Sequence, residues 1–259
     1  MTRKSFSCAV AAAVFVFVSS PVDASDYHHM HLTAPDADAG AQWYYTHMGC
    51  EPVVGRSNAA QCGDTIFLFA AREPTGGSVG SAVNHIGFSF TDLDAKAQEL
   101  ASAGIALEGP VRDIPGLFKI AFVVDPWGTR IELVEHDGYL GFHHIHLSSP
   151  EPTEALDWYQ SVFGGERTRM LDRLDALLYG NIWLLASGAQ EAVAGTQGRS
   201  LDHLGFSFPN LDATIAEMKE NGVEVTTEPR DVTGSPTAAR IAFVNGPNGA
   251  RIEVVQPPK

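Results

Sequence analysis

Basic residues are scarce in this chain of 259 residues: 17 lysines and arginines are set against 31 aspartates and glutamates, for a formal net charge of −14. Nucleic acids and anionic membrane surfaces repel so acidic a protein, and no basic stripe in the sequence offsets the deficit. We therefore expect no nucleic-acid partner and no membrane partner. The expected ligand is a small-molecule substrate, bound by a monomer or a homodimer.

Cysteine is also rare, with three residues in the chain. An oxidising compartment would permit a disulfide between Cys50 and Cys62. If residues 57–59 form the tip of a hairpin, however, Cys62 faces about position 55 rather than 50. A disulfide and two buried free thiols therefore both remain open.

Long hydrophobic runs are missing apart from one near the N-terminus, from Cys8 to Val18, which is shorter than the roughly 20 residues of a membrane-spanning helix. Arg3 and Lys4 precede this run, and small residues ending at Ala24 follow it. This order is typical of a secretory signal peptide, residues 1–24, although a buried N-terminal helix would also fit. We expect a soluble mature chain that is periplasmic or secreted.

The rest of the chain is an internal repeat. His144 follows His29 by 115 positions, His203 follows His85 by 118, and Glu253 follows Glu132 by 121, so small insertions separate matched elements. A duplicated fold tolerates such changes in its loops. The two copies span residues 27–137 and 142–256.

Each copy divides again into two half-units of the order strand, helix, three strands, which predicts an α+β fold. In the first half-unit a strand runs to Ala34, Asp36 caps a helix, and the helix ends near Gly49. Strand alternation places His29 and His31 on one face and apolar residues on the other, which helices must cover. His28 and His143 face the opposite way from the paired histidines, and we interpret them as structural.

The polar face of these strands predicts a metal site, built twice. Two histidines and a glutamate recur in register in each copy, and buried imidazole and carboxylate groups without a partner would be costly. Gly87 and Gly205 lie on the same face and leave room for a ligand. The predicted metal ligands are His29, His85, Glu132, His144, His203 and Glu253.

Four further side chains share this face. His31 and His146 lie two residues beyond a predicted ligand, so either could act as general base or extra ligand, or line the cavity. Arg130 and Arg251 share the parity of the glutamates. They would orient an anionic substrate or form salt bridges at the rim.

These motifs resemble the vicinal oxygen chelate superfamily, which includes glyoxalases, bleomycin-resistance proteins and ring-cleaving dioxygenases. Residues 125–132 resemble the DPxGxxxE turn and final strand of the family, and residues 246–253 match it except that Gly246 replaces the usual aspartate. The resemblance covers nearly all of the mature chain. It implies four βαβββ units in two modules of cupped sheets, and a divalent metal ion such as Fe, Mn, Zn, Ni or Cu.

Positions at which this sequence differs from family members reduce the number of reactions that we expect. Bacterial-type glyoxalase I adds a glutamate ligand, but the corresponding positions here are assigned to Phe67 and Trp183, which cannot bind metal. Ring-cleaving dioxygenases have a tyrosine where Phe122 and Phe243 stand. An exported lyase or isomerase therefore leads, with an Fe(II)- or Cu-dependent dioxygenase and a non-catalytic binding protein of the bleomycin-resistance kind as alternatives.

The last expectation concerns which half-units pair with each other. In this superfamily the half-units pair in sequence, or exchange so that the first pairs with the fourth. Short linkers favour sequential pairing. That pairing predicts two metal clusters, one of His29, His85 and Glu132 and the other of His144, His203 and Glu253.

Overall fold

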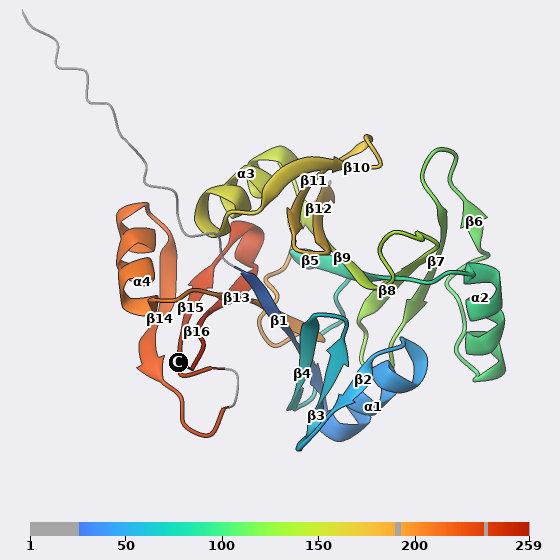
Figure 1. Ribbon diagram of the computed structural model, residues 1–259, viewed down its shortest axis with the longest axis horizontal. Helices are drawn as coiled ribbons and strands as arrows, with labels where there is room; N and C mark the ends of the chain where they lie inside the picture. The colour runs from blue at the N-terminus through green and yellow to red at the C-terminus, as the bar shows by residue number, and fades with distance from the viewer. Residues whose placement is uncertain (1–25, 190–192, 236–237, 259) are drawn as a thin grey trace, which may run out of the picture.

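The computed structural model describes residues 26–189, 193–235 and 238–258 (Figure 1). The predicted signal peptide, residues 1–24, lies outside this part of the chain. The described residues form two eight-stranded sheets and four α-helices, as four βαβββ units. The α+β prediction is therefore confirmed.

The first two units contain residues of the first sequence repeat. Asp36 begins the first helix by accepting hydrogen bonds from the backbone N–H groups of residues 38 and 39, and Asp92 caps the second helix in the same manner. Unit 1 consists of β1 (Asp26–Ala34), α1 (Ala37–His47), β2 (Glu51–Val53), β3 (Arg56–Cys62) and β4 (Thr65–Ala71). Unit 2 consists of β5 (Val83–Ser89), α2 (Leu93–Ser102), β6 (Arg112–Asp113), β7 (Lys119–Val124) and β8 (Arg130–Val134).

The second repeat supplies units 3 and 4. Unit 3 consists of β9 (Gly141–Ser149), α3 (Pro152–Phe163), β10 (Glu166–Met170), β11 (Leu174–Tyr179) and β12 (Ile182–Gly188). Unit 4 consists of β13 (Leu201–Ser207), α4 (Leu211–Glu220), β14 (Glu224–Asp231), β15 (Arg240–Asn245), the 3₁₀ turn η1 (Pro247–Gly249) and β16 (Arg251–Gln256).

The half-units exchange partners, so the prediction of sequential pairing is wrong. One sheet has the order β14-β15-β16-β13-β1-β4-β3-β2 and joins unit 4 to unit 1, and the other has the order β10-β11-β12-β9-β5-β8-β7-β6 and joins unit 3 to unit 2. Figure 1 shows the blue strand β1 beside the red strand β13. Segments 27–137 and 142–256 are repeats in sequence, but neither builds a sheet alone.

Two linkers cross between the sheets and hydrogen-bond to each other. The N–H of Thr75 donates to the carbonyl of Gly198 at 2.8 Å, and the N–H of Ala82 donates to that of Ala194 at 2.9 Å. The segment after unit 1 thus runs along the segment after unit 3, and each carries the chain to the other sheet. The length of a linker does not reveal this pairing.

Cys50 and Cys62 form a disulfide, with their Cα atoms 4.3 Å apart. The turn of this hairpin lies at residues 54 and 55 rather than at 57–59, because Gly55 adopts a positive φ of 77°. A register shift between Pro52 and Val53 then pairs Glu51 with Gln61, which places the two cysteines opposite each other. The choice left open by the sequence is settled in favour of the disulfide.

The apolar faces of both sheets share one core with the helices. The Phe67 ring lies 5.8 Å from that of Phe88 and 4.9 Å from that of Phe142, between centroids, so aromatic side chains connect the two sheets. Tyr44 of α1 and Tyr159 of α3 are fully buried against this core. The paired histidines lie on the opposite face, as the strand alternation predicts.

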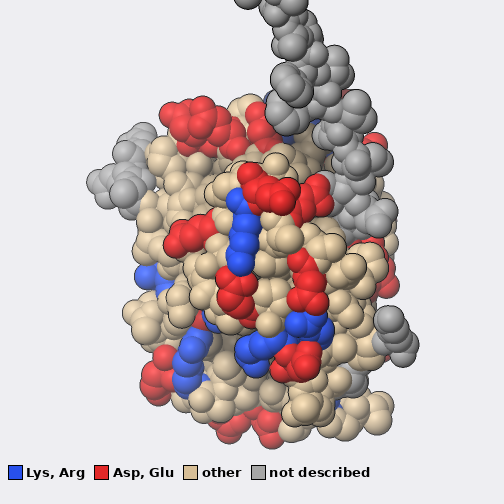
Figure 2. Space-filling view, turned by 90° about the vertical axis from the view of Figure 1, so that its left-hand side faces the viewer, with Lys and Arg blue, Asp and Glu red and all other residues tan. Residues whose placement is uncertain are grey.

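The surface carries mixed charge. Figure 2 shows the side of the molecule near α4 and β14, where basic side chains lie among acidic ones. Ion pairs such as Lys219 with Glu228 and Arg240 with Asp212 account for this arrangement. None of the described helices is long and apolar enough to cross a membrane.

A buried carboxylate fixes the turn between β7 and β8. Asp125 accepts hydrogen bonds from the N–H of Trp127 at 3.0 Å, the N–H of Thr129 at 2.7 Å and the hydroxyl of Tyr44 at 2.9 Å. Burial raises the pKa of Asp125 to about 6. Through Tyr44, this turn links helix α1 of unit 1 to strand β8 of unit 2, which lies in the other sheet.

The matching turn of the second repeat has no carboxylate. A Cβ atom on Gly246 would lie 2.8 Å from Ile252 and 3.3 Å from the Trp158 ring, so no side chain fits without a shift. The hydroxyl of Tyr159, which corresponds to Tyr44, is accordingly buried without a hydrogen-bond partner among the described residues.

We predict that Asp125→Ala lowers the free energy of unfolding by about 3 kcal/mol, because it leaves three donors, two of them buried, without an acceptor. Chemical denaturation of the variant beside wild type measures the change. Asp64→Ala, in an exposed turn, is the control and should lie within about 0.5 kcal/mol of wild type. Equal stability of Asp125→Ala and wild type would contradict this role.

Candidate metal centres

The exchanged pairing joins β1 to β13 and β5 to β9, and we call these two strand pairs the junctions. Four possible metal ligands lie together at each junction. Within each group the ligand atoms all lie within 4.8 Å of one another. The Glu253 centre consists of His29 and His31 on β1, His203 on β13 and Glu253 on β16. The Glu132 centre consists of His85 on β5, Glu132 on β8, and His144 and His146 on β9.

One carboxylate oxygen is the focus of each centre. In the Glu253 centre, Oε2 of Glu253 lies 3.0 Å from Nε2 of His29 and 3.0 Å from Nε2 of His203. In the Glu132 centre, Oε2 of Glu132 lies 3.0 Å from Nε2 of His85 and 3.2 Å from Nε2 of His144. The two centres therefore have nearly the same geometry.

Glycine makes room for one imidazole in each centre. A Cβ atom on Gly205 would lie 2.2 Å from Cε1 of His29, and one on Gly87 would lie 2.0 Å from Cε1 of His144. Gly205 is the strand neighbour of His29, and Gly87 that of His144. The sequence predicts that these glycines leave space for a ligand molecule. That is wrong in detail, because a histidine from the neighbouring strand fills the space.

Four β-bulges lie at the junctions, each directly before a histidine of a centre. The ladder between β1 and β13 skips His28 and Asp202, and the ladder between β5 and β9 skips Asn84 and His143. A bulge breaks strict alternation and re-aims a side chain. For this reason the residue before each histidine can reach that histidine's ring.

Each bulged residue contacts Nδ1 of the histidine that follows it. The distances are 2.8 Å for His28 to His29, 2.9 Å for Asn84 to His85, 2.8 Å for His143 to His144 and 2.5 Å for Asp202 to His203. A proton on Nδ1 that donates to the bulged residue leaves the Nε2 lone pair pointing into the centre. The bulged residues thus orient the ligands.

The structure also gives His28 and His143 a role that strand alternation conceals. His143 is fully buried and contacts His136 at 2.9 Å as well as His144. Strict alternation predicts that both residues face away from the site. The bulges break this alternation, so each side chain contacts the ring of the histidine that follows it. A sequence signal for the role exists, because a hydrogen-bonding residue precedes each of the four histidines.

These residues fit a divalent cation. Nδ1 of His31 and both ring nitrogens of His146 are buried without a hydrogen-bond partner among the described residues, and Nε2 of His29 and of His144 contact the glutamate carboxylates. Buried imidazole nitrogens normally have a hydrogen-bond partner. Their convergence on one carboxylate therefore fits a cation that accepts their lone pairs. Three imidazoles and a carboxylate suit a first-row transition metal.

The protonation states of His31, His146 and the two glutamates agree with this donor set, whereas contacts with Asp202 and Glu253 raise the pKa of His203 against the effect of burial. Burial lowers the pKa of His31 and of His146 well below the usual range, which keeps both rings neutral. Burial alone would raise the pKa of Glu132, but contacts with His144 and His85 outweigh it and lower that pKa. The Glu253 carboxylate is held ionised in the same way by His203 and His29. Neutral imidazole and ionised carboxylate are the forms that bind metal.

All eight predicted site residues lie in the two clusters, but the predicted division between them is wrong. Because β1 pairs with β13, His29 lies with His203 and Glu253 instead of with His85 and Glu132. His31 and His146 complete the clusters as fourth members.

The assignment of Phe67 also needs correction. Phe67 is in register with Met30 and lies in the core, whereas Ile66 and Leu68 are in register with His29 and His31. In the other sheet, Trp183 and Leu185 are in register with His144 and His146. The strand that would carry the extra glutamate of a bacterial-type glyoxalase I is apolar at all of these positions, as expected.

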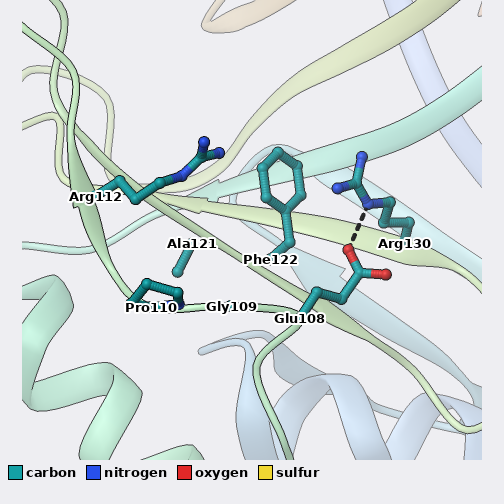
Figure 3. A pocket seen from close by; sticks show the side chains of 7 residues that line it. All are labelled: Glu108, Gly109, Pro110, Arg112, Ala121, Phe122 and Arg130. Carbon is teal, nitrogen blue, oxygen red and sulfur yellow. Dashed lines mark hydrogen bonds and ion pairs between the residues drawn. The ribbon is translucent and has the colours of Figure 1, made fainter.

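A cavity of about 310 Å³ lies beside the Glu132 centre (Figure 3). The Arg130 guanidinium lies 3.8 Å above the Phe122 ring and donates to Glu108 at 2.6 Å, while the Arg112 side chain points toward the same space. The Phe122 ring lines the cavity and is 5.6 Å from that of His85, so the cavity adjoins the ligands. Arg130 thus forms the expected salt bridge and also lines a pocket.

Comparisons with known proteins agree with this architecture. The family model described as Glyoxalase/Bleomycin resistance protein/Dioxygenase superfamily matches residues 26–133 and 141–254. A Mycobacterium tuberculosis protein provisionally named glyoxylase CFP32 is 22% identical over 249 residues, which cover 87% of this chain and 92% of that protein. Glyoxalase I of Saccharomyces cerevisiae is 25% identical over 214 residues, which cover 66% of this chain and 63% of the yeast protein.

The fold resembles that of a solved glyoxalase. The crystal structure of glyoxalase I from Zea mays superposes with a TM-score of 0.71 at 16% identity, covering 90% of this chain and 92% of the maize chain. At this level of identity the likeness establishes the shared fold.

The exchanged pairing predicts which ligand variants act on the same metal. His29→Ala and His203→Ala should each abolish binding at one centre, and the double variant should lose no more than either alone. His29→Ala combined with His85→Ala should lose both metals. Metal content after dialysis against a fixed free-metal concentration measures this. Additive losses for His29 and His203 would contradict the shared centre.

Proposed function

The chain belongs to the Glyoxalase/Bleomycin resistance protein/Dioxygenase superfamily, and from this premise we propose that it is an exported metal-dependent enzyme of the lyase or isomerase type that acts on a small oxygenated compound. The observation that carries the proposal is the convergence of three imidazoles on one buried carboxylate in each centre. A bound divalent cation would hold an oxygen pair of the substrate and stabilise enolate-like negative charge. Fe, Mn, Zn, Ni and Cu all suit this donor set.

His31 and His146 are each the third histidine and the fourth member of their centre. Each is a possible ligand or a possible general base, and their buried, unpartnered nitrogens support the ligand role. The His146 ring lies 4.5 Å from that of His85, and the His31 ring 4.5 Å from that of His203, between centroids. The set of protein ligands thus grows from three to four without a second carboxylate.

The surroundings of the Glu132 centre suit a small anionic substrate. Trp183 and Leu185 form an apolar wall next to the histidines, which would exclude water. Arg112 and Arg130 line the adjoining cavity and would hold a carboxylate or phosphate group. The cavity volume of about 310 Å³ restricts the ligand to a small molecule.

Export is part of the proposal and is supported by two features. The N-terminal sequence has the order of a secretory signal peptide. The Cys50–Cys62 disulfide suits an oxidising compartment. Glutathione is found chiefly in the cytosol, so export disfavours glutathione-dependent chemistry.

We predict that the mature protein begins at Ser25 when the full chain is expressed in a bacterial host. Intact mass of the periplasmic or secreted material measures the cleavage site. Val14→Asp, which places a charge in the middle of the apolar run, is the control and should stay uncleaved. Full-length wild-type chain confined to the cytosol would reject export.

Two other functions remain as alternatives. A dioxygenase would use the same histidines and glutamates, but Phe122 and Phe243, which lie edge-on to His85 and His203, offer no hydroxyl to the site. A non-catalytic binding protein would have no need of two complete ligand sets. The lyase or isomerase hypothesis therefore leads.

The reaction class is tested by proton exchange. Small 2-oxo and 2-hydroxy carbonyl compounds are incubated with metal-loaded protein in D₂O, and deuterium incorporation next to the carbonyl is followed by NMR. Enolate stabilisation predicts metal-dependent exchange that Glu132→Gln and Glu253→Gln together reduce by about 100-fold or more. Glu154→Gln, on the exposed first turn of α3, is the control and should match wild type.

The alternatives give different results in the same experiment. Oxygen consumption with a catechol-type substrate in place of exchange would favour the dioxygenase. Wild-type protein that binds no divalent metal would leave the binding protein as the better account.

A further inference from the structure

We propose that the two centres bind metal with different affinities, and that the Glu253 centre is the tighter one because an aspartate supports one of its histidines where the Glu132 centre has an asparagine. This inference rests on the proposed metal-binding function. The ligand sets are matched, with three imidazoles and one glutamate in each. The difference lies in the bulged residues behind them.

Asp202 supports His203 through a charged hydrogen bond. The Nδ1–H of His203 donates to Oδ1 of Asp202 at 2.5 Å, and the aspartate is 1% exposed. The N–H of Gly198 donates to Oδ2 at 2.6 Å, and Arg251 and Arg72 donate to the two oxygens. The carboxylate is therefore fixed in place as well as buried.

Asn84 supports His85 with a neutral amide oxygen instead. Its Oδ1 lies 2.9 Å from Nδ1 of His85. The bulged histidines do not offset this difference, because His28 and His143 lie at the same distance of 2.8 Å from the rings they support. His143 also contacts His136 at 2.9 Å, but the difference in charge behind the ligands lies at positions 84 and 202.

An anionic acceptor makes an imidazole a stronger ligand. A carboxylate that accepts the Nδ1 proton raises electron density on Nε2 and fixes the tautomer, and loss of such a partner typically costs about 10- to 100-fold in metal affinity. Arg251, which is 21% exposed, offsets more of the carboxylate charge than Arg72, which is 47% exposed and screened by water, but Arg130 lies in the matching position of the Glu132 centre. The Glu253 centre should therefore bind a given metal about 10-fold or more tightly than the Glu132 centre.

The surroundings of Asn84 in the Glu132 centre can accommodate the reciprocal substitution, Asn84→Asp. Arg130 lies 3.8 Å above the Phe122 ring, and Arg251 lies 3.8 Å above the Phe243 ring. Arg251 pairs with Asp202, whereas Arg130 pairs with Glu108. An aspartate at position 84 would therefore meet an arginine placed like the partner of Asp202.

The experiment isolates each centre and exchanges the supporting residue. Metal-free Glu132→Gln protein retains the Glu253 centre, and metal-free Glu253→Gln protein retains the Glu132 centre. Each is titrated with Co²⁺ against a chromophoric chelator, which gives a dissociation constant without any substrate. Asp202→Asn is then added to the first protein and Asn84→Asp to the second.

We expect the Glu132→Gln protein to bind Co²⁺ about 10-fold or more tightly than the Glu253→Gln protein. Asp202→Asn should weaken its centre by about 10- to 100-fold, and Asn84→Asp should strengthen its centre by about 10-fold. Because Asp202 also holds Gly198 and Arg251, its variant could lose affinity through local disorder, and the gain in Asn84→Asp is the decisive arm. Asn181→Asp, in an exposed turn, controls for added charge.

The outcomes separate this inference from the proposed function. Tight binding at both centres with equal constants, or no gain in Asn84→Asp, overturns the affinity difference while metal binding stands. A gain of equal size in Asn181→Asp also overturns it, because net charge would then explain the effect. No Co²⁺ binding in wild-type protein overturns both proposals.

Discussion

The strand junctions β1–β13 and β5–β9 are the constraint on which the site depends. Each junction places a histidine pair from one strand opposite a glycine and a histidine of the other. Without Gly87 and Gly205, the rings of His144 and His29 could not lie against the neighbouring strand. The bulges at these junctions then turn the preceding residues toward the rings. Fold and ligand geometry thus come from the same backbone pairs.

The exchange of half-units makes each centre depend on residues far apart in the chain. The Glu253 centre joins β1, the first described strand, to β13 and β16 of unit 4. Metal binding there would connect the N-terminal and C-terminal units, and so would contribute to stability as well as to chemistry. The Glu132 centre joins the two middle units and adjoins the cavity.

Much of this could be predicted from the sequence because it depends on local periodicity. The helix cap at Asp36, the polar face with His29 and His31, and the repeat itself all follow from spacing. The pairing of units could not be predicted, since it consists of contacts between strands and linkers distant in sequence. The roles of His28 and His143 were hidden because a bulge changes the side of a strand on which a residue lies. The disulfide depends on the turn at Gly55 together with a register shift between Pro52 and Val53, which counting along two regular strands does not reveal.

The central claim is that each cluster of three histidines and a glutamate is a metal centre formed across an exchanged junction. Anomalous diffraction from a crystal of the metal-loaded protein, collected on both sides of the absorption edge of the metal, tests it most directly. The account predicts one peak among His29, His31, His203 and Glu253, and another among His85, Glu132, His144 and His146. Peaks only at surface carboxylates, or a peak shared by His29 and His85, would contradict it.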